Sequence, residues 1–204
     1  MQINKETECE IVKKKLMKTQ EDWVTYFNNK GEKMVSAPDI YKVAKQEKKT
    51  LIGSLKKDFE EDAIITSTKI VYNKNNLKAE VIHDADSKIA KPKKYKIKVP
   101  ELVGEPKQDK ETEAYLQALF DTKDNITTIL RILRRFDQGK KIHLWTPSQS
   151  SRANKQVRAV VLYFGNIRFG VVGDNWFGDS YGLSRGVIID SAKQSKKTKG
   201  VGAR

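Results

Sequence analysis

Hydrophobic residues recur at helical spacing in the first third of the chain. In residues 7–29 they lie on one face of a helical repeat, which predicts an amphipathic helix that ends at Gly31. A second stripe begins after Ser36, a residue typical of N-caps, and continues to Phe59. This stripe predicts either one helix of about 24 residues or two helices, the second capped by Thr50.

Two segments rich in β-formers follow these helices. Residues 63–73 and 77–83 are separated by Lys74, Asn75 and Asn76, which predicts a β-hairpin. Three helices followed by a hairpin is also the element order of a winged-helix domain. The helix expected over residues 49–62 ends in four acidic residues, which is unfavourable for a recognition helix beside phosphates. The winged helix and the long helix with a hairpin therefore both stay open.

Residues 84–110 contain three prolines, many lysines and little periodicity, which is typical of an extended linker. Within this segment Tyr95, Ile97 and Val99 alternate with polar residues, a pattern that indicates a single strand. A basic extended segment of this kind can also follow a phosphate backbone.

A second helical and β-rich unit begins at residue 111. Apolar faces predict two helices, the second capped by Asp124 or Asn125 and ended by Gly139. A tight hairpin is expected around Gly165 and Asn166. The strands expected in this unit are residues 141–146, 157–165, 167–173 and 186–190.

These patterns predict an α+β protein in two parts. The N-terminal part has helices and a β-hairpin, and the C-terminal domain has two helices and a small antiparallel sheet. The expected divisions are residues 1–83, a linker over 84–110, a domain over 111–191 and a basic disordered tail over 192–204.

The charge is the strongest global feature of the composition. The net charge is +14 and the pI is near 9.7, which favours binding of polyanions. Every arginine lies after position 130, and arginine grips phosphate through two parallel hydrogen bonds. The chain has no run of 18 apolar residues, no secretory signal and a single cysteine, Cys9, so we expect an intracellular protein that does not enter a membrane.

Several chemistries have no matching motif. The sequence contains no GxxxxGK[ST] or GxGxxG motif, and its only histidines are His83 and His143. We expect no cofactor and no metal site. Metal-dependent cleavage of phosphodiesters stays open as an alternative, with carboxylates such as Asp174 and Asp179, or Asp84 and Asp86.

Two polar loops are the main candidates for anion binding. Residues 146–155 combine serines with Arg152, Asn154 and Lys155, and residues 182–186 place Ser184 and Arg185 between glycines; both compositions are also typical of turns. Between them, the stretch 171–187 places aromatic rings among glycines, where they either stack on bases or close a small core. The candidate nucleic-acid-binding residues are Arg131, Arg134, Arg135, Ser150, Ser151, Arg152, Lys155, Arg158, Arg168, Trp176, Ser184 and Arg185.

The leading hypothesis is a nucleic-acid-binding protein that contacts the phosphate backbone with weak sequence preference. The sequence does not choose between DNA and RNA, and it leaves open whether the protein is an enzyme. The N-terminal part would add a second contact or dock a protein partner. A third hypothesis is a structural or assembly subunit of a viral or host-defence complex.

Overall fold

The protein is described here from a computed structural model. The structure describes residues 2–3, 19–61, 63–74, 77–136, 141–148, 155–165, 168–176 and 184–188.

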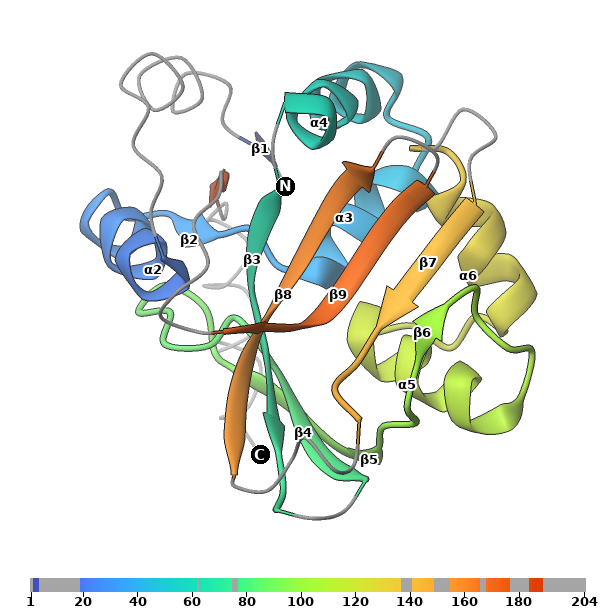
Figure 1. Ribbon diagram of the computed structural model, residues 1–204. Helices are drawn as coiled ribbons and strands as arrows, with labels where there is room; N and C mark the ends of the chain where they lie inside the picture. Colours follow the sequence, from blue (N-terminus) through green and yellow to red (C-terminus); the bar gives the residue numbers. More distant parts are fainter. Residues whose placement is uncertain are drawn as a thin grey trace, which may run out of the picture.

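A seven-stranded mixed sheet organises the fold (Figure 1). Its strand order is β5-β4-β3-β8-β9-β7-β6, and every neighbouring pair is antiparallel except β7 and β9, which are parallel. The strands are β3 (Ile64–Tyr72), β4 (Lys78–His83), β5 (Lys93–Lys98), β6 (Val103–Gly104), β7 (Lys141–Trp145), β8 (Gln156–Gly165) and β9 (Arg168–Trp176). A second, three-stranded sheet consists of β1 (Gln2–Ile3), β10 (Gly186–Ile188) and β2 (Lys33–Met34), with β10 in the centre.

The described helices begin where the sequence offers capping side chains. Thr19, Ser36, Asp109 and Asn125 are the N-caps of α2, α3, α5 and α6. The stripe after Ser36 is split into two helices, because the chain turns at Gln46 and Glu47, and Glu47 has a positive φ of 54°. The helices are α2 (Gln20–Asn29), α3 (Ala37–Lys45), α4 (Lys49–Glu61), α5 (Lys110–Phe120) and α6 (Ile126–Leu133).

The large sheet is buried on both faces along β3 and β8. Alternate residues of β8 show this most clearly, since Val160 and Leu162 belong to the main core while Ala159 and Val161 belong to a second one. The main core lies between the sheet and helices α3, α4, α5 and α6. The second core lies on the opposite face, under α2. Figure 1 shows α3 behind β8 and β9, with α2 on the other side of β3.

The expected two-part architecture is wrong. The hairpin β3–β4 is not the wing of a separate N-terminal domain, because β3 pairs with β8 over its length, for example Ile70 with Arg158. Three of the strands expected to form a small antiparallel sheet of their own, β7, β8 and β9, belong to this same mixed sheet, whereas the fourth, β10, lies in the second sheet. The physical reason is that β3 is buried on both faces and needs hydrogen-bonding partners on both edges, which a free hairpin does not supply.

The segment over residues 84–110 carries two strands of the sheet. Strand β5 has the expected alternation, with Tyr95 and Ile97 packed on the main core, and Val99 just beyond it is fully buried. Residues 99–102 then lead directly to β6, so a four-residue connection joins the two edge strands of the sheet. The expected basic tail, residues 192–204, lies outside the described residues.

Candidate nucleic-acid interface

Strand β5 presents lysines on the face of the sheet that helices α3 to α6 leave uncovered. Because Tyr95 and Ile97 point into the main core, Lys94, Lys96 and Lys98 point to the opposite face. All three lysines are exposed. The alternation of lysine with core residues therefore creates a row of positive charge along an edge strand.

Neighbouring strands extend this row. In the register of β4 and β5, Lys78 lies directly opposite Lys98, and Glu80 lies directly opposite Lys96. Like charges in opposite positions destabilise an antiparallel pair. Part of this cost is offset because Lys98 forms an ion pair with Glu111 of α5. We call Lys78, Lys94, Lys96, Lys98 and Lys155 the lysine face.

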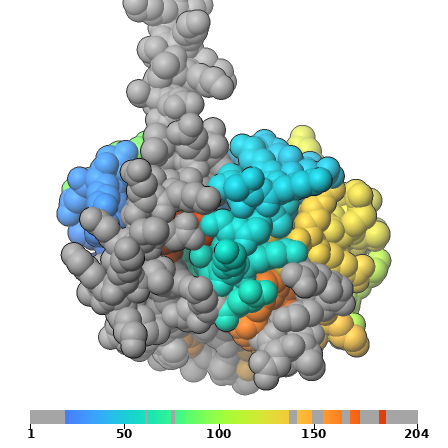
Figure 2. Space-filling model, turned by 90° about the horizontal axis from the view of Figure 1, so that it is seen from above, coloured from blue at the N-terminus to red at the C-terminus, as the bar shows by residue number. Residues whose placement is uncertain are grey.

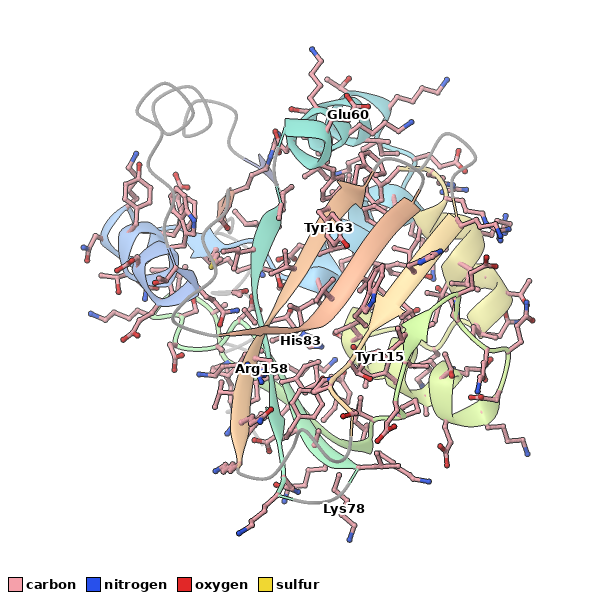
Figure 3. All side chains as sticks on the ribbon, viewed as in Figure 1. Glu60, Lys78, His83, Tyr115, Arg158 and Tyr163 are labelled. Atoms are coloured by element: carbon pink, nitrogen blue, oxygen red, sulfur yellow. The ribbon has the colours of Figure 1, made fainter. Side chains whose placement is uncertain are left out.

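A hollow of about 560 Å³ lies on the lysine face. Its lining includes Lys78, Lys96, Lys98 and Lys155, with Glu80 as the one carboxylate among the residues that line it. Lys94 stands next to it and lies 3.9 Å from Glu80. Figure 3 shows Lys78 at the lower end of the molecule, where β3 ends and β4 and β8 begin. The hollow is open, and four of the nine described residues that line it are lysines, which suits a phosphate group.

The described arginines are not gathered on one surface. Arg135 donates to the carbonyl oxygens of Ala44 (2.6 Å) and Lys45 (3.3 Å) and pairs with Glu47. It therefore holds the C-terminal end of α3, where helix carbonyls lack partners. Arg131 and Arg134, both exposed, lie at the end of α6.

The polar residues of the loop before β10 serve the fold. The Ser184 hydroxyl donates to the carbonyl of Ile65 at 2.9 Å, and Ser184 is buried. Arg185 is also buried, and its guanidinium donates to Asp58 and Ser54 of α4. These contacts join β10 to the rest of the molecule and leave neither side chain on the surface.

The remaining expected site residues fall into two groups. Arg158 is buried, with its guanidinium 2.9 Å from Gln156, whereas Lys155 is exposed and lines the hollow (Figure 3 labels Arg158). Lys155 is thus the expected site residue that the structure places on the lysine face. Ser150, Ser151 and Arg152 lie outside the described residues, as do the side chains of Arg168 and Trp176, whose backbones belong to β9.

A buried ionic cluster lies near the second core. The Lys33 ammonium lies 2.5 Å from Asp39 and 2.7 Å from Asp84, and 8% of the Lys33 side chain is exposed. Burial opposes its charge, but the two carboxylates outweigh burial and raise the pKa of Lys33. Lys33 therefore stays protonated and serves as a bridge between β2, α3 and the end of β4.

Two of the four carboxylates considered for metal-dependent cleavage form ion pairs with lysines. Asp84 pairs with Lys33, and Asp86 pairs with Lys69 at 2.6 Å. The side chain of Asp174 and the whole of Asp179 lie outside the described residues. Within the described ranges no cluster of three or more histidine, cysteine, aspartate or glutamate side chains is arranged to hold a metal ion.

His83 is a structural histidine. Its Nδ1 lies 3.1 Å from the Thr68 hydroxyl and its Nε2 lies 2.8 Å from the carbonyl of Ala118, so the ring links β3, β4 and α5. Burial lowers the pKa of His83. The ring is therefore neutral near pH 7 and supplies no charge to the lysine face.

Comparison of the chain with protein-family models, curated proteins and solved structures finds no match. Among the helices of the described ranges, none has both the length and the apolar character needed to cross a bilayer.

The prediction from the sequence concentrated on arginine and did not include the lysine face. A signal for it was present in residues 93–98, KKYKIK, where lysine occupies each position that alternates with Tyr95 and Ile97. That alternation predicts a half-buried strand with a basic outer face. Lys78 lies on β4 and Lys155 lies immediately before β8, and only the register of the sheet brings them to β5.

Proposed function

We propose that this protein binds nucleic acid through phosphate contacts made by the lysine face, with weak sequence preference. The observation that carries the proposal is the open hollow on β4 and β5, lined by Lys78, Lys96, Lys98 and Lys155 with a single carboxylate. Lysine acts as a hydrated point charge, which attracts phosphate without reading a base. The net charge of +14 adds long-range attraction for polyanions.

The chemical character of the hollow also supports a binding role. Lys78 lies directly opposite Lys98, and a phosphate bound between the two strands would reduce the repulsion between their ammonium groups. Lys96 and Lys155 make no ion pair with any residue in the described ranges, so they are available to a phosphate. Together with Lys78 and Lys98, these two ammonium groups form the core of the interface.

Charge reversal on the lysine face tests the proposal. The variant Lys96→Glu/Lys155→Glu should weaken binding of a DNA or RNA oligonucleotide at least 10-fold, because each lost phosphate contact removes both attraction and counterion release. The matched control is Lys42→Glu/Lys57→Glu, which makes the same charge change at exposed positions of α3 and α4. Equal losses in the two variants would show that only net charge matters and would refute the lysine face as the interface.

A further inference from the structure

Three rings form a surface on the other half of the same sheet face. His143 and Trp145 alternate on β7 with the core residues Ile142 and Leu144, so their rings lie on the face opposite α3 to α6. Tyr163 of β8 lies on that face too, two residues beyond Val161 of the second core. We call His143, Trp145 and Tyr163 the aromatic surface; all three side chains are half-buried.

The rings lie next to one another. The centroids of His143 and Trp145 are 5.4 Å apart with an angle of 38° between the ring planes. Those of Trp145 and Tyr163 are 6.3 Å apart with an angle of 31°. The rings are tilted to one another but neighbour each other, so they form one contiguous aromatic patch, and aromatic side chains of this kind are what nucleobases stack on.

A glycine on β9 sets the position of the Tyr163 ring. Gly170 is paired directly with Tyr163 on one side and with His143 on the other. A Cβ atom at Gly170 would lie 2.4 Å from Cε1 and 2.8 Å from Cζ of the Tyr163 ring. The ring therefore lies against the backbone of β9, in space that any side chain at position 170 would fill.

The aromatic surface and the lysine face share one side of one sheet. Figure 3 shows Tyr163 in the upper half of the molecule and Lys78 at the lower end. Lys98 and Val103 are five residues apart, and Val103 lies directly opposite Trp145. The Cα atoms of Lys98 and Trp145 are consequently at most about 24 Å apart, since an extended chain spans up to about 3.6 Å per residue and paired strands add about 5.5 Å.

We propose that the aromatic surface stacks on unpaired bases, so that the preferred ligand is single-stranded nucleic acid. This inference rests on the proposed function, because the phosphates of the same strand would occupy the lysine face. Bases in a duplex are stacked on each other and do not offer their faces to a protein ring, whereas those of a single strand do. A lysine groove combined with stacking rings is the combination used for single strands without sequence preference.

The experiment compares an oligonucleotide of about twelve nucleotides with an abasic strand of the same length and charge. The wild-type protein should bind the intact strand about 10-fold more tightly, because stacking contributes roughly 1–3 kcal/mol per base. Trp145→Leu and Tyr163→Leu should each reduce this preference about 3-fold and leave binding of the abasic strand unchanged. Trp145→Phe and Tyr163→Phe keep a ring and should retain most of it, which separates stacking from a failure to fold.

The outcomes distinguish the two proposals. Equal affinity for the intact and abasic strands, both sensitive to salt, would overturn stacking and leave the lysine face in place. A preference for the intact strand that persists in both leucine variants would show that the bases bind elsewhere, which also overturns the inference. Binding of neither strand would remove the proposed function, and the stacking role with it. Gly170→Ala, which displaces the Tyr163 ring, should behave as Tyr163→Leu does.

Discussion

Arg185 donates a hydrogen bond through Nε to the carboxylate of Asp58, and only 2% and 7% of the two side chains are exposed. The same guanidinium reaches Ser54, so it holds the residue before β10 against two positions of α4. An arginine between glycines in a polar loop has the composition of an anion site, yet here its anion is a carboxylate of the same chain. This ion pair connects parts of the chain that are 127 residues apart in sequence.

Removing Arg185 should destabilise the protein strongly. In Arg185→Ala the carboxylate of Asp58 stays buried without its counter-ion, which costs about 3–5 kcal/mol in the free energy of unfolding. Urea unfolding followed by circular dichroism measures this loss. The control is Arg131→Ala on the exposed side of α6, which should change stability by no more than about 0.5 kcal/mol. Similar losses in the two variants would contradict a structural role for Arg185.

The Lys33 cluster makes a second prediction about stability. Lys33→Met removes the charge between Asp39 and Asp84 and leaves two carboxylates facing each other in a largely buried site. We expect a loss of about 3–5 kcal/mol in the free energy of unfolding. The double variant Lys33→Met/Asp39→Asn should be less destabilised than the sum of its single variants, because the uncompensated charge is smaller. Strict additivity would show that the three groups do not act as one cluster.

The pH dependence of stability should report on His83. Its pKa is lowered in the folded protein by burial, so the unfolded chain binds a proton first as the pH falls. The contribution of the neutral ring is therefore complete above the unfolded pKa of about 6.5 and is lost progressively below it. The melting temperature should fall between about pH 7.5 and pH 5.5, before most carboxylates titrate. His83→Gln should flatten this profile, and an unchanged slope would assign the effect to other groups.

Salt should weaken binding of a single strand in proportion to the number of phosphates contacted. Four lysines in the hollow predict a slope of log K against log salt of about −2.8, taken as four contacts at about 0.7 each. Between about 50 and 200 mM salt this slope corresponds to a roughly 50-fold loss of affinity. Titrations of a labelled oligonucleotide at several salt concentrations measure the slope, and loss of one contact in Lys96→Glu should reduce its magnitude by about 0.7. A flat profile would exclude binding through the lysine face.

Much of the local structure could be predicted from the sequence. Ser36 and Asn125 begin helices as their residue types indicate, and the hairpin segments over residues 63–73 and 77–83 became β3 and β4. Whether the stripe after Ser36 formed one helix or two could not be settled, because the apolar spacing continues through Glu47. The left-handed backbone of Glu47 ends α3, and Arg135, in the turn after α6, holds that end.

The pairing of the strands could not be predicted from the sequence, and the candidate site depends on that pairing. An alternating pattern shows that a segment is a strand with one apolar face, but backbone hydrogen bonds are chemically alike and do not specify a partner. The sequence therefore predicted that β3 pairs with β4 alone. In the structure β8 pairs with the other edge of β3. The same register places Lys78 opposite Lys98 and brings Lys155 into the same hollow.

Helix caps, strand positions and excess positive charge follow from short stretches of the chain, because capping, side-chain alternation and ionisation depend on near neighbours in sequence. The role of each basic residue does not follow from its neighbours in sequence, because a cation binds whichever anion the folded chain brings within reach. Arg135 and Arg185 meet a glutamate and an aspartate that lie 88 and 127 residues away, and they are used within the fold. The lysines of β4 and β5 are instead left on an open sheet face, because the positions between them are the ones that fill the core.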